Sequence, residues 1–190
     1  MKKVRREDIV DYVTYEEQRD AFRSTVLTIK EARRIHLGES LTFLFENTDT
    51  MRYQIQEMMR AERIVKETDI QHEIDTYNEL LGDSGELGCT LLIEIDDPQE
   101  RDTKLRQWHN LPEHLYAVLE DGTQVPVTYD PRQVGDEKVS SVQYLKIKTG
   151  GRTPVSLGCK HPELSVESPL NTSQKSALTE DLQGDPVPSK

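Results

Sequence analysis

The chain has 190 residues, a formal net charge of −11 and a mean hydropathy of −0.71. Such an acidic chain lacks the clustered Lys and Arg that phosphate backbones require, so we expect no binding to nucleic acid. Its first ten residues are charged rather than apolar, and no run reaches the roughly 18 apolar residues that a membrane span needs. We therefore expect neither a secretory signal nor a membrane anchor, and predict a cytoplasmic protein.

Residues 151–190 differ in composition from the rest of the chain. They contain five of the nine prolines and none of the eleven aromatic residues. A segment with so little large apolar surface gains little from burial, which does not offset the entropy lost when it becomes ordered. We predict a single domain over residues 1–150 and a disordered tail over residues 151–190.

The first predicted elements are a helix and a hairpin. Thr14 and Glu17 form an S/T-x-x-E capping box that would open a helix ending near Arg34. Residues 35–46 then alternate apolar and polar side chains across Gly38, a pattern typical of a strand or a short hairpin.

Residues 49–82 have helical spacing but an unusual density of Glu, Arg, Gln and His beside Met and Ile. Buried or half-buried polar groups need partners, so such a segment is a place to look for a site or an interface. Thr68 and Gln71 offer a second capping box inside it. The segment is therefore one helix or two.

The remaining elements predict an antiparallel sheet with one inserted helix. Residues 87–95 and 139–149 alternate as strands, and residues 98–108 predict a helix with proline at its first position. Asp121-Gly122 is a favoured two-residue hairpin turn between two β-rich runs. The predicted fold class is α+β, with N-terminal helices packed against a mostly antiparallel sheet.

One side of the helix at 50–65 concentrates cationic and amide side chains, which we call the arginine side: Arg52, Gln56, Arg60 and Arg63. Their spacing places them along one side of a helix, where forked guanidinium donors could bind a carboxylate, a phosphate or an acidic partner. A solvated face with intrahelical ion pairs explains the same pattern, so both interpretations stay open.

A metal site is the alternative for the same segment, through Glu57, Glu62, His72 and Glu73. If two helices fold back as a pair, these side chains could meet. Carboxylates and histidines on facing helices hold iron or manganese in di-metal bundles. Those bundles use a Glu-x-x-His repeat, which this chain lacks.

The sequence contains no GxSxG, Walker loop, GxGxxG or HExxH motif. Cys89 lies in a predicted buried strand, where a thiol is inert, and Cys159 lies in the predicted tail. Whether the protein is an enzyme stays uncertain, and the residues favour a non-catalytic role.

The block FENTDTMRYQIQEMMRAERI, with the later segments HEIDTYNELL, ELGCTLLIEI and VSSVQYLKI, resembles family 3501 of the catalogued bacterial domains of unknown function. The similarity spans roughly residues 5–148. It implies no activity, cofactor or catalytic residue. Because such genes are associated with rubrerythrin and an iron–sulfur oxidoreductase, it implies a partner in such a redox system. We therefore expect an accessory protein that binds a partner protein through the arginine side.

Overall fold

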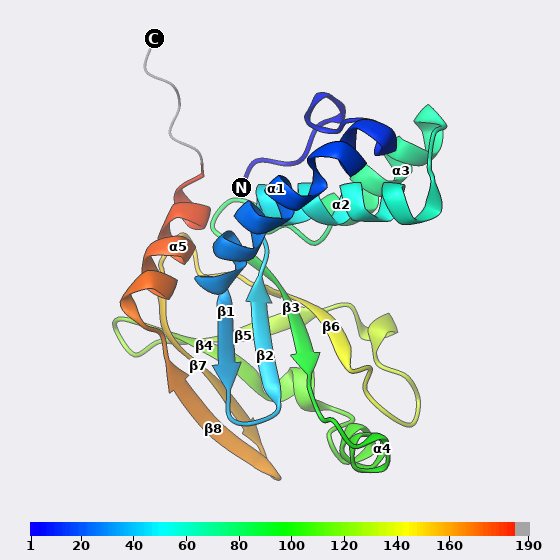
Figure 1. The fold of residues 1–190 in the computed structure, drawn as a ribbon. Coiled ribbons are helices and arrows are strands. Elements are labelled where there is room, and N and C mark those ends of the chain that lie inside the picture. Colours follow the sequence, from blue (N-terminus) through cyan, green and yellow to red (C-terminus); the bar gives the residue numbers. More distant parts are fainter. Residues whose placement is uncertain (185–190) are drawn as a thin grey trace.

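The computed structural model describes residues 1–184, which form a curved antiparallel sheet and a group of helices (Figure 1). Three helices lie together across one end of the sheet, a fourth lies at the opposite end, and the fifth runs beside the sheet. This arrangement confirms the predicted α+β fold class.

The helices are short to medium in length, and within residues 1–184 none is both long and apolar enough to cross a membrane. The α-helices are α1 (Tyr12–Glu31), α2 (Thr48–Glu62), α3 (Glu67–Asn78), α4 (Pro98–Gln107) and α5 (Thr172–Gln183). Three 3₁₀ turns accompany them, η1 (Arg6–Asp8), η2 (Leu111–His114) and η3 (Pro131–Gln133). The strands are β1 (Arg34–Leu37), β2 (Leu41–Phe45), β3 (Leu87–Ile93), β4 (Leu115–Leu119), β5 (Gln124–Tyr129), β6 (Val142–Ile147), β7 (Pro154–His161) and β8 (Leu164–Pro169).

The eight strands form one sheet in the order β1-β2-β3-β6-β5-β4-β7-β8, and every neighbouring pair is antiparallel. The sheet curves until its two outer strands approach each other. At the β1–β2 turn, a Cβ added to Gly38 would lie 3.7 Å from the side chain of Val166 in β8. Gly38 has φ +65, which confirms the predicted hairpin across this glycine.

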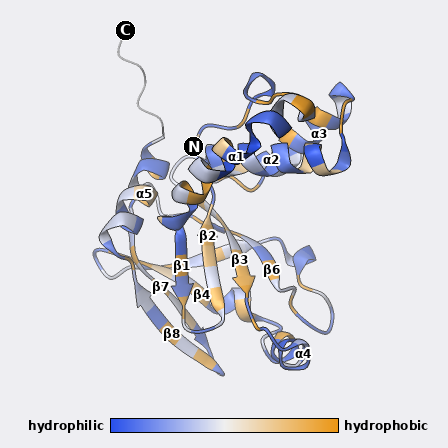
Figure 2. Ribbon diagram, in the orientation of Figure 1, coloured by the Kyte–Doolittle hydropathy of each residue, from blue (hydrophilic) through white to orange (hydrophobic). Residues whose placement is uncertain are grey.

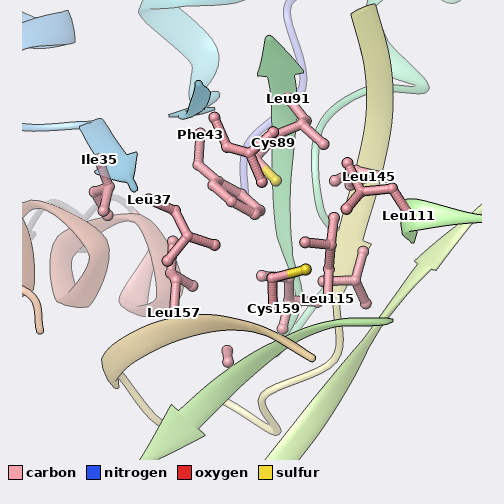
Figure 3. Packing of buried hydrophobic residues seen from close by; sticks show 14 of the residues in the cluster. Ile35, Leu37, Phe43, Cys89, Leu91, Leu111, Leu115, Leu145, Leu157 and Cys159 are labelled. Atoms are coloured by element: carbon pink, nitrogen blue, oxygen red, sulfur yellow. The ribbon is translucent and has the colours of Figure 1, made fainter. Parts of the chain in front are cut away.

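The main core fills the inside of the curved sheet. Apolar residues are concentrated along β2 and β3 (Figure 2). Phe43, Leu91, Leu145, Leu115 and Leu157 come from five different strands and pack together there (Figure 3). Burying large side chains at this density supplies the main favourable free energy of folding.

The predicted disordered tail is wrong for residues 154–183. β7 lies between β4 and β8, and Leu157, Cys159 and Leu178 are buried in the main core. This segment therefore contributes aliphatic and thiol side chains to the core, and it needs no aromatic residues to become ordered. Three of the prolines stand at the start of β7, in the β7–β8 turn and at the end of β8, where a missing N–H is tolerated. The end of the predicted tail, at 185–190, lies outside the described residues.

The 49–82 segment is two helices, α2 and α3. They are separated at Arg63, which ends α2 in the left-handed conformation with φ 52 and ψ 45. The predicted capping box at Thr68 is wrong, because α3 begins one residue after Lys66 and has no side-chain cap. The predicted capping box at Thr14 is also wrong, because α1 begins two residues earlier, at Tyr12. The Asp11 carboxylate is the N-cap and accepts hydrogen bonds from the N–H groups of Val13 and Thr14.

Two predicted elements in the middle of the chain are confirmed. Pro98 opens α4, whose N-terminal N–H groups bind the Asp97 carboxylate. The predicted hairpin at Asp121-Gly122 joins β4 to β5, but its loop has three residues, 120–122, and not the predicted two, because the Leu119 N–H donates to the Thr123 carbonyl and the Gly122 N–H to the Leu119 carbonyl. Gly122 has φ +81, which a glycine at the end of such a loop adopts without strain.

Candidate functional site

The predicted arginine side faces other parts of the chain. The Arg52 guanidinium lies 4.6 Å from the centre of the Phe22 ring and 3.4 Å from Asp49. The Gln56 side chain is 3% exposed, and its amide exchanges two hydrogen bonds with the backbone of Val10, at 2.8 and 3.1 Å. These two residues therefore attach α2 to α1 and to the N-terminal segment.

Arg60 belongs to an ion network between α1 and α2, centred on Glu57. Its guanidinium lies 3.6 Å from Glu57 and 3.6 Å from Glu16. The Glu57 carboxylate also accepts bonds from the Tyr15 hydroxyl at 2.7 Å and from Arg19 at 2.8 and 3.0 Å. The Arg19 bonds, followed by the one from Tyr15, lower the pKa of Glu57 to about 2, although burial opposes this.

Arg63 alone of the four is exposed, and it ends α2 instead of continuing its side. The four residues thus share no open surface. As a binding surface they are a poor candidate, because a guanidinium already paired with its own chain must lose that partner before it binds another.

The predicted metal residues are divided between two places. Glu62, His72 and Glu73 line a 480 Å³ hollow between α2 and α3. Glu57 is held in the α1–α2 ion network instead. Within residues 1–184, no three His, Cys, Asp or Glu side chains are grouped so that they could hold a metal ion.

A second histidine arrangement joins η2 to β7. The N–H of Glu163 donates to His161 Nδ1 at 3.2 Å, so the proton of this buried ring is on Nε2, which bonds Asn110 Oδ1 at 3.2 Å. The Asn110 amide then donates to His114 Nε2 at 3.0 Å. These hydrogen bonds fix the orientations of the His161 and His114 rings, so a structural role accounts for both histidines. In this arrangement His161 Nε2 carries the proton and donates it in the hydrogen bond to Asn110.

Neither cysteine is placed as a nucleophile. Both thiols are free and buried, Cys89 in β3 and Cys159 in β7. Burial raises the pKa of each thiol, and the nearby Glu46 carboxylate raises that of Cys89 further. The reactive thiolate form is therefore disfavoured at neutral pH.

A hollow of 630 Å³ lies where α5 meets the end of α1. Arg33 and Asp181 form a buried ion pair in its wall, with two bonds of 2.8 Å, and Asn47 lies 3.4 Å from the same carboxylate. Gly184, the last described residue, is also part of the wall, so the described chain does not close this hollow. We assign the ion pair a structural role, because it joins α5 to the rest of the fold.

Another hollow lies between the end of α3 and the outer face of β5 and β6. We call it the β5–β6 hollow, and it has a volume of 450 Å³. It is lined by Glu79, Leu80, Thr128, Tyr129, Asp130, Gln133, Tyr144, Leu145 and Lys146. Alternation along β6 turns Tyr144 outward, where it is 43% exposed, while its neighbours Gln143 and Leu145 are buried.

The wall of the β5–β6 hollow is fixed by specific bonds. The Gln133 amide donates to the Tyr144 carbonyl at 3.1 Å and accepts from the Tyr144 N–H at 2.7 Å. It thus takes the place of a neighbouring strand where β5 has ended. Tyr129 packs against the main core, and its hydroxyl donates to Glu113 at 3.3 Å. The backbone behind Tyr144 is therefore held in place without using the Tyr144 ring.

A second hollow of 550 Å³ continues from the first along α3. It is lined by Lys3, Asp75, Asn78, Glu79, Asp83 and Lys146. Glu79 and Lys146 line both hollows. The two hollows therefore adjoin at these side chains, and we call them together the α3–β6 groove.

The α3–β6 groove has an excess of negative charge. Four carboxylates and two ammonium groups line it. Both ammonium groups have partners inside the chain: Lys3 donates to the carbonyls of Asn78 and Leu81, and Lys146 lies 3.7 Å from Glu86. The Glu79 carboxylate makes no hydrogen bond or salt bridge within the described chain.

The residue pattern contained weak signals for this groove. Val142 and Tyr144 alternate with buried residues on a strand, so an outward-facing tyrosine could be predicted. The acidic spacing of Asp75, Glu79 and Asp83 was also visible. The sequence did not predict that Tyr144 and these acidic residues lie close together, because β6 and the end of α3 are more than sixty residues apart in the chain.

The chain is similar to known proteins over nearly its whole length. A crystal structure of a protein of unknown function from Burkholderia pseudomallei has a TM-score of 0.88 and 28% sequence identity, covering 95% of this chain and 100% of that one. No curated protein matches the chain significantly. The family model described as a protein of unknown function, DUF3501, matches residues 3–182, which includes β7, β8 and most of α5. The match extends the resemblance seen in the sequence past residue 148, and the chain belongs to the DUF3501 family.

Proposed function

We propose that this protein is a non-catalytic docking protein that binds a segment of a partner protein in the α3–β6 groove. The observation that carries the proposal is that two hollows, of 450 and 550 Å³, adjoin each other and share Glu79 and Lys146 as wall residues. A groove of this length suits an extended segment with two or more side chains in it.

The state of the other reactive groups supports a binding role. Both thiols are buried with a raised pKa, and His161 is held as a neutral donor by its backbone bond. The charged groups of the α1–α2 contact are paired with each other. The groove, in contrast, presents Tyr144 and Glu79 to the outside.

Partners in a rubrerythrin or iron–sulfur redox system are the first proteins to test, because the family resemblance suggests that association. A photo-crosslinking amino acid, benzoylphenylalanine, replaces Tyr144 in a bacterial host, and the same amino acid at the exposed Val13 of α1 is the control. The proposal expects a partner to be linked from position 144 and not from position 13.

The linked protein is then purified, and its affinity is measured by calorimetry. Tyr144→Ala and Glu79→Gln should each weaken binding, whereas Asp20→Asn, an equal change of charge on the exposed part of α1, should not. Equal affinity for all three variants, or stronger linkage from position 13, would contradict the proposal. The same measurements with a purified rubrerythrin and iron–sulfur oxidoreductase test the named partners directly.

A further inference from the structure

We infer that the segment bound in the α3–β6 groove is basic and places one Lys or Arg side chain against Tyr144 and Glu79 and a second near Asp75 and Asp83. The inference rests on the proposed function and specifies the chemistry of its partner. It is carried by three features of the groove: an exposed aromatic ring with no cation over it in the described chain, two carboxylates, Glu79 and Asp75, that form no salt bridge there, and lysines that already have partners.

The aromatic ring of Tyr144 differs from other rings of the chain. Cations of the protein itself lie over four of them, at 4.6 to 5.6 Å from the ring centre: Phe22, Tyr53, Trp108 and Tyr116. Tyr144 has no such cation over it within residues 1–184, although it is 43% exposed. An exposed aromatic face in a concave site attracts a cation through the negative face of its ring, and more strongly the further water is excluded.

The carboxylates on and after α3 also favour binding of a cation. Glu79 forms no salt bridge in the described chain, although the exposed Arg132 guanidinium interacts with it electrostatically. The Asp75 carboxylate accepts a hydrogen bond from the neutral amide of Gln71, at 2.8 Å. Asp83 lies 3.7 Å from Lys3, whose ammonium donates mainly to two carbonyls at the end of α3. The second part of the groove therefore also favours a cation.

An anionic or a purely apolar segment fits less well. An anionic side chain would meet Asp75, Glu79 and Asp83 as well as Asp130, which is already paired with Arg132, and Lys146 could reach it only by leaving Glu86. An apolar segment would cover Glu79 and Asp75 without pairing them, which carries the desolvation cost of a buried charge. The net charge of −11 further steers basic partners toward the molecule.

The test uses peptide probes that differ in charge at constant shape. The probes are acetyl-Gly-Arg-Gly-Arg-Gly-amide, the same peptide with citrulline in place of both arginines, and the same peptide with glutamate. Each is titrated into the full-length ¹⁵N-labelled protein, and amide shifts are followed by NMR. The inference expects the arginine peptide to shift Glu79, Thr128 and Tyr144 and to bind at least about tenfold more tightly than citrulline, a difference of about 1.4 kcal/mol.

Two further measurements, at high ionic strength and with a charge-reversal variant, test whether peptide binding is electrostatic and whether it involves Glu79. Raising the ionic strength from about 0.1 M to about 1 M shortens the Debye length from about 10 Å to about 3 Å, so arginine-peptide binding should weaken strongly. Glu79→Lys should abolish the shifts at Tyr144, whereas Asp20→Lys should leave them unchanged. Unaltered thermal unfolding of Glu79→Lys shows that its fold is intact, and Glu79→Gln, with an intermediate loss, is the milder second variant.

The outcomes separate the two proposals. Binding of the citrulline or glutamate peptide in the groove, as tight as that of the arginine peptide, overturns the basic segment and leaves the docking groove. Absence of groove shifts with the arginine peptide overturns the basic segment as well. If position 144 also fails to link a partner, the docking function fails with it.

Discussion

The α1–α2 contact and the α3–β6 groove contain similar residues and use them in opposite ways. In the contact, Glu57 binds Tyr15 and Arg19, and Arg52 lies over Phe22. In the groove, Glu79 and Tyr144 have no equivalent partners within the described chain. The density of charged and aromatic residues in a segment therefore does not locate a binding surface. What locates it is the charge and aromatic area left over after the fold has paired its own groups.

The largest expected effect is at Glu57. Glu57→Ala removes the acceptor for Tyr15 and Arg19 and should lower the free energy of unfolding by about 2–3 kcal/mol, because hydrogen bonds to a charged group are lost together. Urea unfolding measures it. Glu62→Ala, an exposed change on the same helix, should cost less than about 0.5 kcal/mol. An equal loss of unfolding free energy in the two variants would contradict the comparison, because the contact between α1 and α2 would then not depend on the ion network of Glu57.

The same carboxylate predicts an acid transition. Arg19 holds the pKa of Glu57 at about 2 in the folded protein, below its ordinary value of 4.5. A lowered folded pKa means that this contribution is fully present above pH 4.5 and is lost as the pH falls from 4.5 toward 2. Unfolding measured across that range should show a loss on the order of 2 kcal/mol that Glu57→Ala does not share. Parallel pH profiles for the two proteins would show that Glu57 is not the group responsible.

Two tyrosines test the comparison in both directions. Tyr53 lies under Lys30 and against Phe22 in the helix contact, so Tyr53→Ala should cost about 1–2 kcal/mol of stability and leave binding of the arginine peptide unchanged. Tyr144→Ala should do the reverse, with about a threefold to tenfold loss of affinity and little change in unfolding. Stability and affinity that fall together in both variants would argue that the two regions are not separate.

The smallest effect is expected at Arg63. Its φ of 52 lies in the left-handed region, which glycine adopts without the Cβ clash. Arg63→Gly should therefore raise the free energy of unfolding by up to about 1 kcal/mol, and peptide affinity should not change. Reduced partner binding in this variant would restore the arginine side as an interface, contrary to the geometry of α2.

Local patterns predicted much of the fold because their causes are local. Proline at the start of α4 and the Asp121-Gly122 turn act through backbone conformation within a few residues. The same reasoning failed for β7 and β8, whose order depends on pairing with β4 and on burial of Leu157 in a core built by distant strands. Amino-acid composition alone predicts neither which strands pair nor which side chains are buried.

The sequence by itself determined the α+β class, the approximate positions of several helices and strands before residue 150, the acidic charge and the family. Only the tertiary structure decided which polar groups are paired, because a side chain's partners come from elements far away in the chain. It placed Gln56 against Val10, brought Arg60 close to Glu16 and Glu57, and left Glu79 beside β6 without a salt bridge in the described chain. The surface available for a partner is what remains after that pairing, so it exists only once the chain has folded.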